Sequence, residues 1–219
     1  KDASNYRRGV GKCIWMIVLR PGIYYATKEC AQALAHPTVE DLAKLRHLIR
    51  YLIGTKHYTL TISPNIHTTP DSPHDLEVYV DSDWAGCRTT RKSTSGCVCV
   101  LLGCAVRHYS RTQSTIATSS GEAELYAIGN GISEGLGLIN FFQEGQLLSK
   151  TSLVVYTDST SARAISTRVG TSRLTKQIQL RFLYIQDLVA AGLLRVKKVS
   201  TTSNMSDPKY LPAPTLHTV

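Results

Sequence analysis

The sequence of 219 residues lacks three features: an apolar run of about 18 residues, a C-x-x-C pair and an internal repeat. These absences exclude a membrane-spanning helix, the commonest zinc-binding spacing and a solenoid. The start, from Lys1 to Arg8, also lacks an initiator methionine and a clean apolar core, so we expect no signal peptide and interpret it as the middle of a longer polypeptide. Cys97 and Cys99 alternate with valines as core strand residues do, and free buried thiols are typical of an intracellular protein.

Acidic residues are scarce as well. The 16 Asp and Glu residues face 25 Lys and Arg residues, which gives a net charge of +9. This balance favours a polyanionic partner, with nucleic acid before a membrane because no apolar span is present. The apolar share of 42% and the charged share of 19% are ordinary for a globular protein, and the length allows one sizeable core or a domain with a helical appendage.

The first third of the chain predicts helices. Residues 10–19 and 23–34 are expected to form two of them, and Thr38 is expected to cap a third that carries leucines at three- and four-residue spacing. Residues 63–75 are rich in Pro, Asp and Ser and predict a linker. The expected domains are a helical part with its linker at 1–70, a second domain at 71–212 and a tail at 213–219.

From residue 76 onward the pattern is typical of strands alternating with helices. The expected order is strands at 78–81, 96–102 and 106–110, a helix at 119–148, a strand at 153–157, helices at 159–166 and 174–191, and a strand at 193–199. The first three strands are expected to be antiparallel neighbours, and the later strands can join the sheet only through helical crossovers. The predicted fold class is therefore α/β, a mixed five-stranded sheet flanked by helices and preceded by a small helical segment.

Two of the predicted strands end in an Asp-Ser pair. Asp81 and Asp158 each follow a short apolar run, and side chains at the carboxyl ends of neighbouring strands meet in one crevice of an open sheet. Glu124, early in the long helix, and Asp207, near the end, are further candidates. Converging carboxylates without His or Cys suit Mg²⁺ or Mn²⁺, and two such ions about 3.5–4 Å apart support phosphodiester hydrolysis. In a basic protein this pattern points to a nuclease, although Asp-Ser after a strand is also an ordinary helix N-cap.

Four ordered motifs carry a more specific signal. They are Tyr79-Val80-Asp81-Ser82-Asp83-Trp84-Ala85-Gly86, Arg91-Lys92-Ser93-Thr94-Ser95-Gly96, Ser119-Ser120-Gly121-Glu122-Ala123-Glu124-Leu125-Tyr126-Ala127 and Tyr156-Thr157-Asp158-Ser159. Together they resemble the ribonuclease H domain of copia-type retrotransposon Pol polyproteins. Residues 6–12, 20–23 and 45–55 are similar to the segment that joins the reverse transcriptase of those polyproteins to this domain.

The resemblance implies a ribonuclease H-like fold and hydrolysis of the RNA strand of RNA–DNA hybrids by two-metal-ion catalysis. It implies Mg²⁺ or Mn²⁺, with two ions, as the cofactor. The implied ligands are Asp81, Glu124, Asp158 and Asp207, whereas Asp83 and Glu122 are implied to be neighbours, with Asp83 as the substitute for Asp81. The implied partners are the hybrid and the rest of the Pol polyprotein, including its reverse transcriptase and integrase.

Basic and hydroxyl side chains near these acids are candidates for holding the hybrid. Arg91, Lys92, Arg173 and Lys176 would neutralise phosphates, and Ser95 and Ser119 would hydrogen-bond the 2′-hydroxyls that distinguish RNA from DNA. Each of the basic residues is more readily explained as a solvated surface charge, and each of the two serines is equally explained as a turn residue or a helix cap. Trp84 has two interpretations, stacking on the nucleic acid or packing against the sheet.

Departures from the family pattern favour an alternative function, a degenerate module that binds nucleic acid without turnover. Pro208 directly follows Asp207 in a shortened motif and restricts its backbone geometry. Gln177 stands where the family commonly has a titratable group, and Cys87 where it usually has an acid. A third possibility, an integrase-type transferase, needs two Asp residues followed by a late Glu, which the order Asp-Glu-Asp-Asp argues against. The paired Asp turn of a reverse transcriptase is absent.

Overall fold

A computed structural model describes residues 2–58, 60–64, 72–167 and 180–206 of the chain. The backbone contacts divide the chain between Thr61 and Ile62 into a helical unit and a sheet unit. The predicted domain boundaries at residues 70 and 212 lie outside the described residues. Among the helices that the structure describes, none is long and apolar enough to cross a membrane.

The helical unit contains α1 (Asp2–Met16), the short 3-10 helix η1 (Pro21–Ile23), α2 (Tyr24–Gln32) and α3 (Val39–Gly54). Helix α1 begins before the predicted residue 10 because Tyr6 is buried and its hydroxyl donates to the Cys30 carbonyl of α2 at 2.6 Å. Helix α3 starts as predicted, since the Thr38 hydroxyl accepts from the Asp41 N–H and the Asp41 carboxylate accepts in return.

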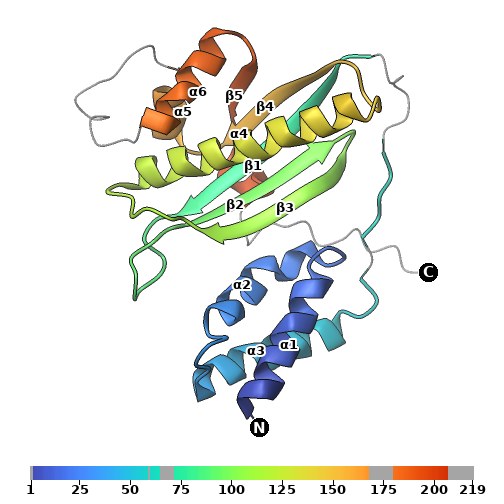
Figure 1. Cartoon of the computed structure of the whole chain (residues 1–219), viewed down its shortest axis with the longest axis vertical. Coiled ribbons are helices and arrows are strands. Elements are labelled where there is room, and N and C mark those ends of the chain that lie inside the picture. The colour runs from blue at the N-terminus through green and yellow to red at the C-terminus, as the bar shows by residue number, and fades with distance from the viewer. Residues whose placement is uncertain (1, 59, 65–71, 168–179, 207–219) are drawn as a thin grey trace. The chain divides into compact units, whose positions relative to one another are not determined.

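The sheet unit is built on five strands in the order β3-β2-β1-β4-β5 (Figure 1). The strands are β1 (His74–Asp83), β2 (Thr94–Leu101), β3 (Cys104–Thr112), β4 (Thr151–Thr157) and β5 (Leu194–Lys198). β1 and β2, and β2 and β3, are antiparallel, whereas β1 and β4, and β4 and β5, are parallel. This arrangement confirms the predicted mixed sheet and the side-by-side placement of the two strands that end in Asp-Ser.

In the part of the sheet unit that the structure describes, the helices are α4 (Ser120–Glu144), α5 (Thr160–Thr167) and α6 (Leu180–Ala190), and a 3-10 turn, η3 (Thr201–Ser203), follows β5. Figure 1 shows α4 lying along the sheet, and α5 and α6 contact α4 and each other. The predicted start of the last helix at residue 174 lies outside the described residues. Helix α4 ends at Glu144 instead of 148, with Gly145 at its C-cap.

The contact between α4 and the sheet depends on two glycines. A Cβ atom on Gly131 would lie 2.5 Å from Val80 of β1, and one on Gly135 would lie 2.6 Å from Leu153 of β4. Glycine at these positions lets the helix backbone come close to the buried side of both strands. The start of α4 is thereby held against the carboxyl ends of β1 and β4, where the two acids were predicted.

Candidate functional site

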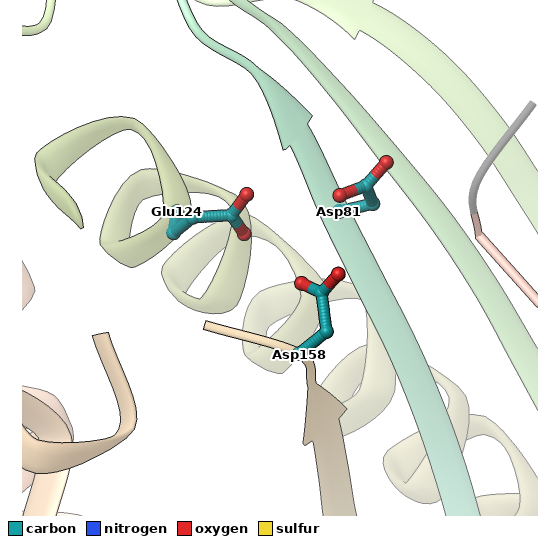
Figure 2. A group of neighbouring side chains, drawn as sticks. All are labelled: Asp81, Glu124 and Asp158. Atoms are coloured by element: carbon teal, nitrogen blue, oxygen red, sulfur yellow. The ribbon is translucent and has the colours of Figure 1, made fainter. Parts of the chain in front are cut away.

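Three of the predicted acids meet at one place in the sheet unit. Asp81 lies near the end of β1, Asp158 directly follows β4, and Glu124 lies early in α4. One carboxylate oxygen of each lies within 4.8 Å of the others. Figure 2 shows the three side chains pointing toward one another from a strand, a helix and a strand end.

The strand register places the two aspartates at the same level. Tyr79 of β1 pairs with Tyr156 of the parallel strand β4, and each aspartate comes two residues later. Because successive side chains of a strand alternate between faces, equal offsets from a paired position favour the same direction. The parallel pairing therefore brings Asp81 and Asp158 together.

Helix α4 supplies the third carboxylate from its first turns. The helix begins at a true N-cap, where the Ser119 hydroxyl accepts from the Glu122 N–H at 3.2 Å. Glu124 then reaches the end of β1, where its Oε1 accepts from the Ser82 N–H at 3.2 Å. This bond ties the helix side chain to the residue that follows Asp81.

Glu124 is the most buried member of this acidic triad, which we define as Asp81, Glu124 and Asp158. Glu124 is only 8% exposed, and its Oε2 has no hydrogen-bond partner among the described residues. Burial, followed by the charges of Asp81 and Asp158, raises the pKa of Glu124 to about 8, while the Ser82 N–H acts in the opposite direction. The site thus holds a proton more tightly than an ordinary glutamate does.

This chemistry fits a divalent cation. Three carboxylates this close repel one another unless a proton or a cation compensates their charge. The donor atoms are all oxygens, which hard cations prefer, and the unpaired Oε2 of Glu124 is a buried acceptor that such an ion would satisfy. The residues present therefore suit a divalent metal.

Two neighbouring acids have local structural roles. Asp83 accepts from the Thr94 N–H, and its carboxylate fills the space beside Gly86, so the structure commits it to the loop between β1 and β2. Burial raises the pKa of Glu122, but hydrogen bonds from Thr118 and Tyr126 outweigh this and hold it below its usual range. Asp83 is thus a poor substitute for Asp81.

A further residue near the triad, Gln113, was not predicted from the sequence. It directly follows β3, is 5% exposed, and its Nε2 lies 2.8 Å from the Ala123 carbonyl, 2.9 Å from Ser95 Oγ and 3.2 Å from Ser82 Oγ. These partners are 10 to 31 residues away in sequence. No local pattern marks a single glutamine in a polar loop, so only the fold reveals it.

The predicted substrate-binding residues differ in their surroundings. Arg91 is exposed, in the loop between β1 and β2, and Ser119 is exposed at the α4 N-cap. Ser95 is only 1% exposed and accepts from Gln113, which gives its hydroxyl an internal role and argues against a 2′-hydroxyl contact. Lys92 lies half-buried in the same loop as Arg91. The remaining candidates, Arg173, Lys176 and Asp207, lie outside the described residues, as do Gln177 and Pro208.

Trp84 combines features of both its interpretations. Its indole N–H donates to the Ala117 carbonyl at 3.1 Å, which links the end of β1 to the loop before α4. The residue is still 52% exposed. The ring is thus anchored at its nitrogen while part of its surface faces solvent.

Two solved structures are similar to this chain. LC11-RNase H1, isolated from compost by a metagenomic approach, is 17% identical with a TM-score of 0.45 over 64% of this chain and 95% of that chain. The foamy viral protease-reverse transcriptase in complex with RNA/DNA hybrid is 12% identical with a TM-score of 0.51 over 84% of this chain and 23% of that chain. At these identities the likeness concerns the fold alone. The five-stranded sheet with its helices defines a ribonuclease H fold.

Sequence relatives identify the family. No family model matches the sequence. The retrovirus-related Pol polyprotein from transposon RE1 of Arabidopsis thaliana is 29% identical over 206 residues, and that from transposon TNT 1-94 of Nicotiana tabacum is 32% identical over 203 residues. These matches cover 94% and 92% of the chain, which spans 14% and 15% of the two polyproteins. The chain is homologous to a part of the Pol polyproteins of retrotransposons.

Proposed function

We propose that the chain is an endoribonuclease that hydrolyses the RNA strand of RNA–DNA hybrids as part of a retrotransposon Pol polyprotein. The observation that carries this proposal is the acidic triad: three carboxylates from distant parts of the sequence meet at the carboxyl ends of two parallel strands. An α/β sheet commonly binds its ligand at this position. The ribonuclease H fold and the family support a nucleic acid as that ligand.

The proposed cofactor is Mg²⁺ or Mn²⁺, with two ions. Asp81, Glu124 and Asp158 would hold the metal, and Asp207 is proposed as the fourth ligand. Bound ions of this kind activate a water molecule and stabilise the leaving oxygen in phosphodiester hydrolysis. The chain itself contributes the placement of the carboxylates, through the strand register and through the Ser82 N–H that orients Glu124.

Basic residues support the proposed partner. The net charge of +9 favours a polyanion, and the exposed Arg91 and the half-buried Lys92 lie in the loop that follows the triad strand β1. Contacts of this type neutralise phosphates and carry little sequence preference, as a nuclease for hybrids of any sequence requires. We further propose that the reverse transcriptase and integrase of a Pol polyprotein are its partners and that it acts inside the cell.

The test is cleavage of a labelled RNA–DNA hybrid with Mg²⁺ or Mn²⁺. We expect the wild type to shorten the RNA strand and Asp158→Asn to lose this activity, because the variant removes one carboxylate from the triad. Asp187→Asn is the matched control, since Asp187 is an exposed acid on α6. Equal cleavage by all three proteins would mean that the triad is not the site of hydrolysis.

A second candidate function is hybrid binding without turnover. The observation that favours it is Pro208, which directly follows the proposed fourth ligand and restricts its backbone. A folded wild type that binds the hybrid without cleaving it, and that titrates with one weak ion instead of two, would establish this alternative.

A further inference from the structure

The Gln113 side chain lies where three elements of the sheet unit meet. Its amide nitrogen contacts Ser82 of β1, Ser95 of β2 and Ala123 of α4 within 2.8 to 3.2 Å. Its backbone N–H donates to the Ser93 carbonyl at 2.8 Å, which fixes the residue itself.

The Ala123 carbonyl fixes the orientation of the Gln113 amide. A carbonyl oxygen only accepts hydrogen bonds, so the group that faces it must be the amide nitrogen and not the amide oxygen. The two N–H groups are then distributed over the carbonyl and the two serine hydroxyls. Burial of the side chain keeps water from replacing these bonds.

Two of these acceptors adjoin the acidic triad directly. Ser82 follows Asp81 in β1, and Ala123 precedes Glu124 in α4. Ser82 also donates its N–H to Glu124 Oε1 at 3.2 Å. The amide of Gln113 therefore ties together the two backbone segments that determine the distance between Asp81 and Glu124.

We propose that Gln113 is a positioning residue that sets the metal affinity of the acidic triad. The Gln113 bonds hold the end of β1 and the start of α4 at the separation that brings the three carboxylates within 4.8 Å of one another. Groups that orient metal ligands without touching the metal typically account for about 10- to 100-fold in affinity. The inference rests on the proposed metal site and adds to it a residue that holds no ion.

The experiment measures Mn²⁺ binding to the full chain by electron paramagnetic resonance. Gln113→Met keeps the length of the side chain and removes its donors, and we expect the Kd for Mn²⁺ to rise about 10-fold. Gln186→Met is the matched control, since Gln186 makes the same kind of bond, 2.8 Å from its amide nitrogen to the Ile165 carbonyl, between α6 and α5. Its Kd is expected to stay within about twofold of the wild type.

Thermal unfolding separates positioning from a general loss of stability. Both variants are expected to melt at lower temperature, but only Gln113→Met is expected to bind Mn²⁺ more weakly while folded. An unchanged Kd for Gln113→Met, or an equal rise for both variants, overturns the proposal. If Gln113→Met does not fold, Gln113→Asn takes its place: it keeps the amide on a shorter side chain, and an unchanged Kd overturns the proposal in the same way.

Hybrid cleavage is measured on the same samples, so that the proposed function and this inference fail separately. A wild type that binds Mn²⁺ without cleaving the hybrid contradicts the nuclease, while the ratio of the Kd values still decides the role of Gln113. A folded wild type that binds no Mn²⁺ overturns the inference, because no metal site then exists for Gln113 to position.

Discussion

Replacing Glu124 by glutamine is expected to stabilise the metal-free protein at alkaline pH. Burial, and then the charges of Asp81 and Asp158, raises the pKa of Glu124 from 4.5 to about 8 in the folded chain. A folded-state pKa above the unfolded value means that the group's contribution to stability is complete below about pH 4.5 and is lost as the pH rises toward 8. Glutamine carries no charge, and its amide oxygen can still accept from the Ser82 N–H.

The magnitude follows from the two pKa values. Each pH unit between them corresponds to about 1.4 kcal/mol, so the ionisable side chain lowers the free energy of unfolding by on the order of 4–5 kcal/mol between pH 4.5 and pH 8. The difference between Glu124→Gln and the wild type is therefore expected to be small at pH 4 and to grow to several kcal/mol at pH 8. A divalent metal should reverse the order, since only the wild type keeps all three carboxylates.

The assay is urea unfolding in the presence of a chelator at pH 4, 6, 8 and 9. Glu122→Gln is a matched control with the opposite sign, because hydrogen bonds from Thr118 and Tyr126 outweigh burial and lower the pKa of Glu122. That variant is expected to be less stable than the wild type at neutral pH, with a difference that shrinks as the pH falls. If the unfolding free energy of Glu124→Gln runs parallel to the wild type from pH 4 to pH 9, the triad does not hold Glu124 in the protonated form.

Two further predictions test the site and its support. Mg²⁺ in 100-fold excess over its Kd is expected to raise the free energy of unfolding of the wild type by about 2.7 kcal/mol, but not that of Asp158→Asn; equal melting shifts for both proteins would contradict the site. Gly131→Ala, whose new Cβ meets the sheet at 2.5 Å, is expected to cost about 1–3 kcal/mol in urea unfolding, whereas Gly137→Ala, with no atom within 4 Å, is expected to be neutral or slightly stabilising; equal effects would mean that α4 does not need glycine at this contact.

The sequence predicted the sheet well because its strands are apolar runs with clear ends. The pairing of β1 with β4 followed from two runs of the same design, and parallel pairing then brought Asp81 and Asp158 to one edge. The length of β1 was underestimated: the strand starts at His74, because Asp75 and Glu77 alternate with buried residues on the opposite side of the strand. The predicted strand covered only residues 78–81, and charged residues just before it resemble a loop unless the alternation is followed along the whole strand.

The bonds around the site could not be predicted from the sequence. Gln113 contacts residues 10, 18 and 31 positions away, and such distances carry no periodic signal. Ser95 was a candidate for hydrogen-bonding a 2′-hydroxyl, but the strand turns its side chain inward toward Gln113. Both results depend on tertiary contacts between loops and strand ends, for which a single sequence has no local pattern.

The Asp-Ser pair after strand β4 had two interpretations, and the geometry of the α5 cap bears on both. An aspartate at this position was equally explained as the N-cap of the following helix. In the structure the cap of α5 is Ser159, whose hydroxyl accepts from the Ala162 N–H at 3.2 Å and whose carbonyl accepts from the Arg163 N–H at 3.1 Å. Capping α5 therefore does not require Asp158, and its carboxylate lies in the triad instead.

The motifs that contain Asp81 and Glu124 show the same division of roles. Asp83 is committed to the β1–β2 loop through the Thr94 N–H, while Asp81 lies in the triad. Glu122 accepts hydrogen bonds at the start of α4, while Glu124, two residues further along the helix, keeps a buried oxygen without a partner among the described residues. In each motif, local hydrogen bonds account for one polar residue, and the other acidic residue places its carboxylate in the triad. Three carboxylates of this kind in one place destabilise the metal-free fold, and a bound cation is the simplest physical reason for a chain to keep them there.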